Sequence, residues 1–151
     1  MTEVTTTHSE AGTQSVAETF ARRLQRGDVV ALYGDLGSGK TQFVKGLTEA
    51  FRSSTHATSP SFVLLNRYEG KDAEGRELLL YHFDLYRVRS AAELYDIGFE
   101  EYLRGNGISF IEWAENVGDL LPESRYDIRI SPGDAESERR IEITSTGIPE
   151  R

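Results

Sequence analysis

Residues 29–41 read Val-Val-Ala-Leu-Tyr-Gly-Asp-Leu-Gly-Ser-Gly-Lys-Thr and are the most informative segment for the fold. Its first five residues form an apolar run without alternation, which is typical of a strand buried on both faces of a sheet. Residues 34–41 match the P-loop pattern Gly-x-x-x-x-Gly-Lys-Ser/Thr at every fixed position. An amphipathic segment at 41–51 follows. The stretch therefore predicts a buried strand, a phosphate-binding loop and a helix, in that order.

A P-loop holds nucleotide phosphates with its backbone amides. Its glycines let those amides approach the phosphate oxygens, and the N-terminus of the following helix offers further N–H groups to the same anion. We expect Lys40 to reach the β- and γ-phosphates and the Thr41 hydroxyl to bind Mg²⁺. The expected phosphate-binding residues are Asp35, Leu36, Gly37, Ser38, Gly39, Lys40 and Thr41. The cofactors are predicted to be ATP and Mg²⁺, because the sequence lacks the Asn-Lys-x-Asp segment by which GTPases read guanine.

Two acidic residues stand at the ends of predicted buried strands. Asp84 follows Leu-Leu-Leu-Tyr-His-Phe, and Glu112 follows Ile-Ser-Phe-Ile. P-loop NTPases hold Mg²⁺ with such an acid, directly or through water. Asp84 and Glu112 are thus candidate metal ligands and, with Lys40, candidate catalytic residues; which carboxylate contacts the metal stays open. His82 shares a strand face with Asp84, so it either orients Asp84 or a water, or is a half-buried structural residue. Trp113 either stacks on a base near the site or belongs to the core.

The remaining pattern predicts a single α/β domain over residues 9–146, with a mixed parallel and antiparallel sheet flanked by helices. Residues 61–68 and 77–86 predict two strands, joined by a connection too short for a crossover helix and therefore paired as an antiparallel hairpin. The other expected elements are helices at 9–26, 90–94 and 99–103, a strand at 108–111, and a final hairpin of 125–131 and 138–145. Residues 1–8 are expected to be a flexible N-terminus, and 147–151 a tail.

Composition narrows the class of protein. The chain has 151 residues, with 25 acidic and 17 basic ones, and its net charge is −8. Because nucleic acid is gripped mainly by Lys and Arg, such a chain is not expected to bind RNA unaided. The absence of cysteine excludes disulfides and thiolate zinc sites. No apolar run approaches the roughly 20 residues of a spanning helix, and residues 1–9 lack the features of a secretory signal. We expect a cytoplasmic protein with no membrane segment.

Five segments together resemble the TsaE family. They are Gly-Asp-Leu-Gly-Ser-Gly-Lys-Thr (34–41), Thr-Ser-Pro-Ser-Phe (58–62), Tyr-His-Phe-Asp-Leu-Tyr-Arg (81–87), Glu-Leu-Tyr-Asp-Ile-Gly (93–98) and Ile-Glu-Trp-Ala-Glu (111–115). The similarity extends from about Thr13 to the last strand, in the family's order and spacing.

The resemblance implies an ATPase of bacterial tRNA threonylcarbamoyladenosine modification. It implies that the chain works with the TsaB and TsaD subunits and meets tRNA only through their complex. Nucleotide binding would govern docking, and hydrolysis would reset the complex between turnovers. The resemblance makes Glu112 the metal-associated acid, Asp84 a second essential acid, Thr13 a nucleotide contact and residues 58–62 a switch-like loop. Ser61 departs from the family's usual threonine but keeps the hydroxyl.

Two other functions share the P-loop. A small-molecule kinase would need a substrate pocket and an arginine-bearing lid, and no such segment stands out in the sequence. An ATP-dependent assembly factor would clamp its partners without hydrolysing the nucleotide, and residue types do not separate it from an ATPase. In the ATPase, Mg²⁺ and Lys40 would neutralise charge developing at the γ-phosphate while an acid positions water. Hydrolysis is expected to be slow without partners, because no arginine finger is evident near the P-loop.

Overall fold

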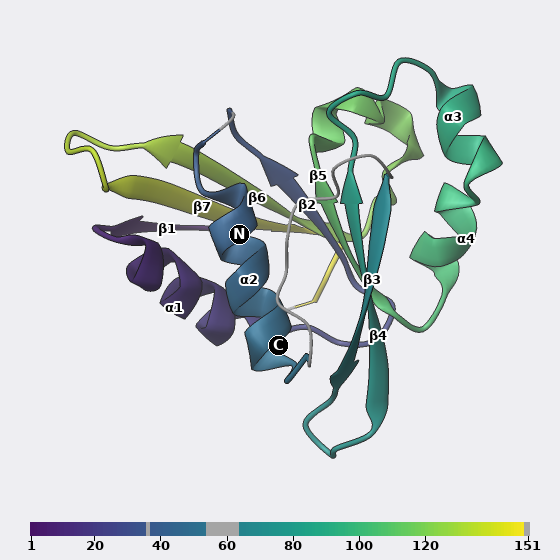
Figure 1. The fold of residues 1–151 in the computed structure, drawn as a ribbon, viewed down its shortest axis with the longest axis horizontal. Helices are drawn as coiled ribbons and strands as arrows, with labels where there is room; N and C mark the ends of the chain where they lie inside the picture. The colour runs from purple at the N-terminus through teal and green to yellow at the C-terminus, as the bar shows by residue number, and fades with distance from the viewer. Residues whose placement is uncertain (36, 54–63, 150–151) are drawn as a thin grey trace.

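The computed structural model describes residues 1–35, 37–53 and 64–149, which build one seven-stranded sheet with helices on both faces (Figure 1). The strands are β1 (Thr2–Thr7), β2 (Val29–Tyr33), β3 (Leu65–Lys71), β4 (Glu77–Asp84), β5 (Ile108–Glu112), β6 (Arg125–Pro132) and β7 (Arg139–Thr146). The helices are α1 (Glu10–Ala21), α2 (Lys40–Ala50), α3 (Ala91–Asp96) and α4 (Phe99–Arg104), followed by the 3₁₀ turns η1 (Ala114–Asn116) and η2 (Gly118–Leu120). Among the described residues, no helix has the length and apolar character needed to cross a bilayer.

The sheet is mixed, as predicted. Its strand order is β1-β7-β6-β2-β5-β4-β3. The central strand β2 runs parallel to both β5 and β6, and β5 runs parallel to β4. The pairs β1–β7, β6–β7 and β3–β4 are antiparallel, which confirms both expected hairpins. Every residue of β5 and all but the last of β2 are buried, as parallel strands covered on both faces require.

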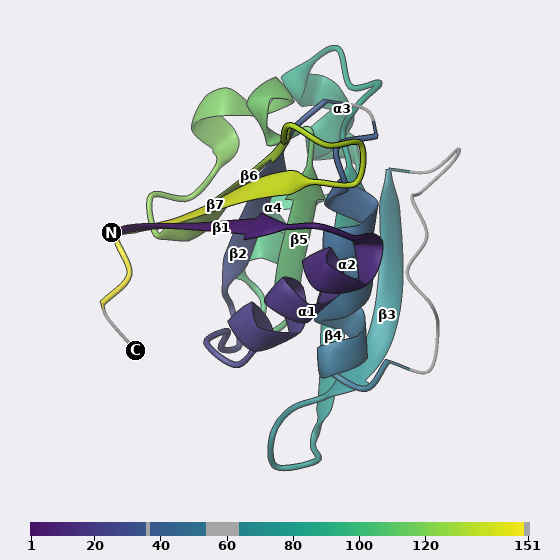
Figure 2. The same cartoon turned by 90° about the vertical axis from the view of Figure 1, so that its left-hand side faces the viewer.

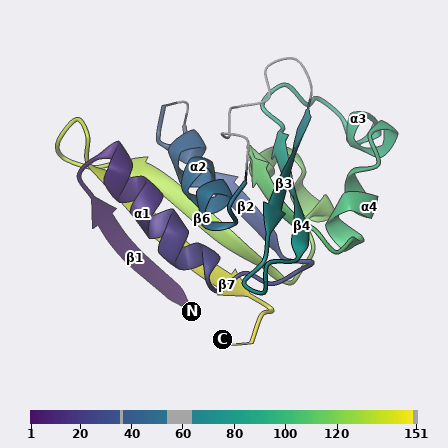
Figure 3. The same ribbon diagram turned by 60° about the horizontal axis from the view of Figure 1, so that its bottom comes forward.

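Two apolar layers sandwich the sheet. On one face α1 and α2 contribute Phe20, Phe43 and Leu47 to a core that includes Leu80 and Phe110 of the sheet. On the other face Phe83 and Ile111 pack with the α3, α4 and η1 residues Leu94, Phe99 and Ala114. Figures 2 and 3 show α1 and α2 on the side of the sheet away from α4. Even-numbered residues of β4 and β5 therefore face α2, and odd-numbered residues face α3 and α4.

The N-terminus differs from the expectation of a flexible end. Thr2 to Thr7 form β1, which pairs along its whole length with β7. All of these residues except Thr7 are exposed, so the strand carries no alternation of apolar and polar residues. The β-branched threonines nevertheless favour extended backbone, and β7 supplies the hydrogen-bonding edge. The pairing partner lies more than 130 residues away in the chain, which a local pattern does not reveal.

Several element boundaries also shift. Helix α1 ends at Ala21 instead of 26, because the next turns use tighter bonds such as Arg23 N–H to the Phe20 carbonyl. Ser9 caps this helix by accepting from the Gly12 N–H at 3.0 Å. The Glu93 carboxylate accepts from the Ser90 N–H at 3.2 Å, as part of a capping box at the start of α3. Of the strand expected at 61–68, residues 61–63 lie outside the described residues.

Candidate functional site

A glycine-rich loop carries the chain from β2 into α2. Gly37 and Gly39 have φ of 77° and 112°, in the region that favours glycine. At Gly34 a Cβ would lie 2.5 Å from both the Ile130 carbonyl oxygen and the Ser38 Oγ. Any larger residue would clash there, so this loop keeps its shape only with glycine at 34.

The loop forms a cradle suited to an anion. Ser38 is 2% exposed, and its Oγ is a buried side-chain oxygen with no hydrogen-bond partner in the described part of the chain. Gly39 occupies the N-cap position of α2, where no described side chain caps the first turn. The N-terminal N–H groups of such a helix, together with its dipole, attract negative charge. A phosphate group would satisfy the hydrogen-bonding capacity that this cradle leaves open.

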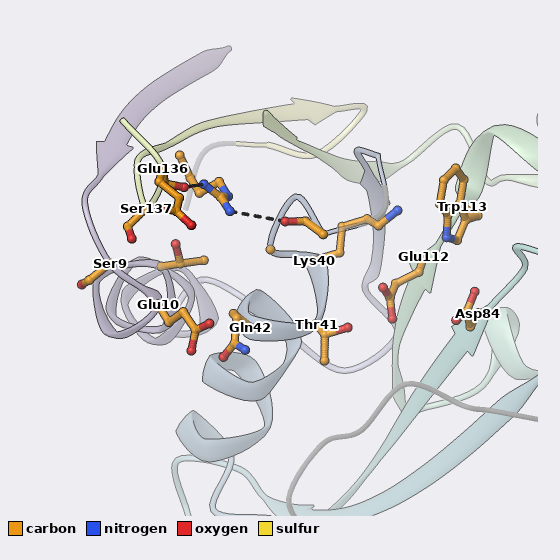
Figure 4. Close-up of a pocket in the computed structure, with 14 residues that line it drawn as sticks. Ser9, Glu10, Lys40, Thr41, Gln42, Asp84, Glu112, Trp113, Glu136 and Ser137 are labelled. Carbon is orange, nitrogen blue, oxygen red and sulfur yellow. Dashed lines mark hydrogen bonds between the residues drawn. The ribbon is translucent and has the colours of Figure 1, made fainter. Parts of the chain in front are cut away.

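A cavity of about 410 Å³ opens beside the cradle (Figure 4). This volume is within the range of small-molecule sites. Its lining comes from the start of α1, the P-loop, the ends of β4 and β5, and the β6–β7 hairpin. The lining residues are Ser9, Glu10, Thr13, Gly37, Gly39, Lys40, Thr41, Gln42, Asp84, Glu112, Trp113, Glu136, Ser137 and Arg139.

Most of the predicted site residues meet in this cavity. Both acids, Lys40, Thr41 and Thr13 line it. The Thr13 side chain is buried and its Oγ1 lies 2.9 Å from that of Thr7. Asp35 is exposed beside the loop and does not line the cavity, although its carbonyl accepts from the Ser38 N–H at 3.0 Å. Leu36 and the switch-like segment 58–62 lie outside the described residues.

Lys40 points across the cavity to β5. Its Nζ lies 3.5 Å from the centroid of the Trp113 ring and also donates to the Gly34 carbonyl. Burial lowers the pKa of the Lys40 ammonium, and the surrounding carboxylates oppose that shift. Those carboxylates belong to Glu112, Glu115, Asp84 and Asp35. The lysine is thus held as a partly desolvated cation among acids.

The two acids face α2 from paired positions of β4 and β5. Asp84 is half-buried, and its Oδ1 accepts from the Tyr86 N–H at 3.1 Å. Burial raises the pKa of the Asp84 carboxyl, assisted by the nearby Glu112 charge and opposed by the Tyr86 N–H. Glu112 is 3% exposed, and its Oε2 lies 2.5 Å from the His82 Nε2.

His82 is hydrogen-bonded inside the protein, as the structural alternative expected, but it is fully buried instead of half-buried. The expected contact with Asp84 is replaced by one with Glu112. The reason is register: His82 pairs with Phe110 across β4 and β5, two residues before Glu112. Trp113 is only partly buried, at a φ of 59°, and its ring packs 4.9 Å from that of Tyr86. Stacking of Trp113 on a base remains a prediction.

Arg139 is one of the cavity-lining residues that sequence reasoning did not place at the site; the others are Ser9, Glu10, Gln42, Glu136 and Ser137. The Arg139 Nε donates to the Ser38 carbonyl at 2.8 Å, and a terminal guanidinium nitrogen donates to the Gly37 carbonyl at 3.3 Å. Arg139 thus lies beside the P-loop as a contact of loop carbonyls, and the absence of an arginine finger stays a prediction. The contact spans 101 residues of chain and arises because β6 pairs with β2, which brings the β6–β7 hairpin over the loop (Figure 4). The residues around Arg139 form no local motif that predicts its contact with the P-loop.

The oxygen donors around the cavity suit a magnesium ion. Thr41, Asp84 and Glu112 supply a hydroxyl and two carboxylates. Within residues 1–35, 37–53 and 64–149 there is no cluster of three or more histidine, aspartate or glutamate side chains that would form a complete cage. Mg²⁺ typically takes one or two carboxylates and completes its shell with waters and substrate phosphates. The donor set therefore fits Mg²⁺ bound together with a phosphate ligand.

Comparison with known proteins shows which family the chain is similar to. The profile of the family described as threonylcarbamoyl adenosine biosynthesis protein TsaE matches residues 7–141. The tRNA threonylcarbamoyladenosine biosynthesis protein TsaE of Bacillus subtilis (strain 168) is 37% identical over 135 residues, covering 89% of this chain and 80% of the relative. The protein of that name from Treponema pallidum (strain Nichols) is 44% identical over 110 residues, or 73% of this chain and 76% of the relative.

A solved structure shares the fold. The crystal structure of Bacillus subtilis YdiB superposes with a TM-score of 0.77 at 33% sequence identity, covering 97% of this chain and 87% of that one. The family profile spans most of the chain, and these relatives are 37% and 44% identical to it, which establishes the family. The chain belongs to the TsaE family, which takes part in tRNA threonylcarbamoyladenosine biosynthesis.

Proposed function

We propose that this chain binds ATP with Mg²⁺ in the cavity beside the P-loop and hydrolyses the γ-phosphate, as the ATPase of tRNA threonylcarbamoyladenosine modification. One observation carries the proposal. The phosphate cradle at the start of α2 and the carboxylates of Asp84 and Glu112 face the same cavity of about 410 Å³. An anion-binding loop opposed by hard oxygen ligands is the arrangement that a magnesium–nucleotide complex needs.

Each part of the cavity has a proposed role in binding the magnesium–nucleotide complex. The P-loop amides and the Ser38 hydroxyl bind phosphate oxygens, and the Lys40 ammonium leaves the Trp113 ring to meet the β- and γ-phosphates. Thr41 and Glu112 are the ligands proposed for Mg²⁺, which when bound neutralises charge on the phosphate oxygens. The end of the cavity lined by Ser9, Thr13 and Glu136 is left for the ribose and base. Ser9 and Glu136 lie across the cavity from Trp113 (Figure 4), so this proposal does not use Trp113 as the stacking partner of the base.

Asp84 is the proposed water-positioning acid. Its carboxyl is half-buried at the edge of the cavity, and burial raises its pKa. A carboxylate with a raised pKa is a better acceptor for a proton from an attacking water. Glu112, held by His82 at 2.5 Å, has less freedom to reorient during a reaction. We therefore assign water to Asp84 and the metal to Glu112.

Membership of the TsaE family supports a proposal about the partners. We propose that the chain works with TsaB and TsaD and meets tRNA only through them, since its net charge of −8 disfavours direct binding of RNA. Hydrolysis by the isolated chain would be slow if a partner supplies a group that completes the site. Arg139 donates to P-loop carbonyls at 2.8 and 3.3 Å, so it is committed to the loop and is not placed as a finger on the γ-phosphate.

ATP hydrolysis with and without partners tests the proposal. We expect a slow Mg²⁺-dependent rate for the purified chain, strong stimulation by TsaB–TsaD, and loss of both in Lys40→Ala. Lys45→Ala is the matched control, because Lys45 lies on the same helix and does not line the cavity. A rate that TsaB–TsaD leaves unchanged would remove the pathway assignment and favour a kinase. Nucleotide binding without turnover under either condition would favour the assembly factor.

A further inference from the structure

A buried chain of side chains runs from β3 through β4 to the acid at the end of β5. Tyr68 on β3 places its hydroxyl 3.2 Å from the His82 Nδ1, and the His82 Nε2 lies 2.5 Å from the Glu112 Oε2. Tyr68, His82 and Glu112 are 3%, 0% and 3% exposed. Both Tyr68 and His82 are buried beneath the cavity and absent from its lining, so only Glu112 connects this chain to the site.

One hydrogen-bond direction in this chain follows from chemistry. An ionised carboxylate has no proton to donate, so at the Glu112 end the His82 Nε2–H is the donor and Glu112 Oε2 the acceptor. At the other end the Tyr68 hydroxyl lies beside the His82 Nδ1, and the Asn66 amide donates to the Tyr68 oxygen at 3.3 Å. Both ring nitrogens of His82 therefore have a polar neighbour, which holds the ring in one orientation.

Strand geometry explains why these residues meet. Across the antiparallel β3–β4 pair, Tyr68 stands opposite Leu80, and across the parallel β4–β5 pair Phe110 stands opposite His82. Tyr68 and Glu112 are therefore diagonal neighbours of His82, on opposite sides of its strand. The even-numbered residues of β4 and β5 face α2, so the imidazole bridges two strands under the helix that begins at Lys40.

We propose that His82 is a positioning residue for Glu112, with Tyr68 fixing the orientation of the His82 ring. The proposal rests on the proposed function, since it takes Glu112 as the acid toward Mg²⁺. A glutamate has three rotatable side-chain bonds, and a fixed donor at Oε2 removes most of that freedom while leaving Oε1 to face the cavity. Partners of this kind behind a metal-binding carboxylate typically change metal affinity by about 10- to 100-fold when removed.

The test separates metal binding from nucleotide binding. Calorimetry measures the dissociation constant of the non-hydrolysable analogue AMPPNP with Mg²⁺ and with EDTA. The value with EDTA divided by the value with Mg²⁺ gives the factor by which the metal strengthens binding. We expect His82→Leu to lower this ratio by about tenfold, and Tyr68→Phe by about threefold. The EDTA value should stay within about twofold of wild type in both, because the P-loop is untouched. His82→Gln should restore most of the ratio, since its amide N–H can stand near the position of Nε2.

Controls distinguish positioning from a structural role. Tyr81→Phe removes a hydroxyl from the opposite face of β4, where that ring packs 4.8 Å from Tyr102, and should leave the ratio unchanged. The proposal would be overturned if His82→Leu bound AMPPNP more weakly by the same factor with and without metal. A wild-type ratio in His82→Leu would overturn it as well. If His82→Leu does not fold, an unchanged ratio in Tyr68→Phe overturns it instead. A wild-type chain that binds AMPPNP under neither condition would overturn the proposed function along with it.

Discussion

The Lys40 ammonium lies 3.5 Å from the centroid of the Trp113 ring. A cation at this distance over an indole face is attracted by the ring quadrupole, worth roughly 1–2 kcal/mol when desolvated. Lys40 is also the residue expected to contact the β- and γ-phosphates. The Lys40 ammonium is therefore held against an aromatic ring, and the proposed binding of nucleotide phosphates would replace that contact.

This contact predicts a fluorescence change at Trp113, the single tryptophan of the chain. We expect the emission spectrum to change when ATP and Mg²⁺ are added, because the cation leaves the ring. Lys40→Met removes the charge, so its spectrum without nucleotide should already differ from wild type and should not respond to nucleotide. Identical ligand-free spectra for wild type and Lys40→Met would contradict the contact.

We expect the Asp84 carboxylate to lower the stability of the fold while it supports activity. Burial raises its folded-state pKa above the ordinary value, so its contribution to stability is greatest at low pH and is lost as pH rises through the folded pKa. At pH 7.5, without nucleotide or metal, Asp84→Asn should therefore raise the Tm by about 2 °C. The gain should shrink as the pH falls toward about 4.

The same substitution should slow ATP hydrolysis by roughly 100-fold or more, since an amide cannot accept a proton from water. Paired thermal melts at pH 7.5 and 4.5, together with a rate assay, check both effects. Asp119→Asn is the control, because Asp119 is exposed in η2. A lower Tm for Asp84→Asn at pH 7.5 would show that the Asp84 carboxylate does not destabilise the fold.

Arg139 should matter for nucleotide affinity, because it fixes two P-loop carbonyls at 2.8 and 3.3 Å. We expect Arg139→Ala to weaken ATP binding by about 3- to 10-fold, or roughly 1 kcal/mol, through a less ordered loop. Arg140→Ala is a close control: Arg140 pairs with Glu142 at 2.9 Å on the surface, and exposed pairs contribute little. Equal affinities of the two variants, measured by calorimetry, would remove Arg139 from the site.

Gly46 should be intolerant of any side chain. A Cβ there would lie 2.4 Å from the Gln14 carbonyl oxygen and 2.7 Å from the Ala17 Cβ, where α1 crosses α2. Gly46→Ala should therefore force the helices apart and cost about 2 kcal/mol, a fall in Tm of roughly 4–8 °C. Thermal unfolding checks this, with the exposed Glu49→Ala on the same helix as control. An unchanged Tm would mean that the two helices separate without penalty.

Local pattern was enough for the centre of the sheet. The run at 29–33 and the glycines after it encode a strand and a tight turn, and the structure places β2 at those residues. The β3–β4 hairpin was predictable because its connection is too short for a crossover. The strand β1 was not, because its exposed threonines lack any period and its stability comes from β7.

The P-loop on an α/β domain, and Lys40, Thr41, Asp84 and Glu112 as candidate site residues, could be predicted from the amino-acid pattern. The hydrogen bond of His82 to Glu112 and the contact of Arg139 with the P-loop became visible in the folded chain. The reason is physical. Strand period and turn chemistry act over a few residues and are written locally, whereas the register between β4 and β5 and the pairing of β6 with β2 depend on how distant segments share one core.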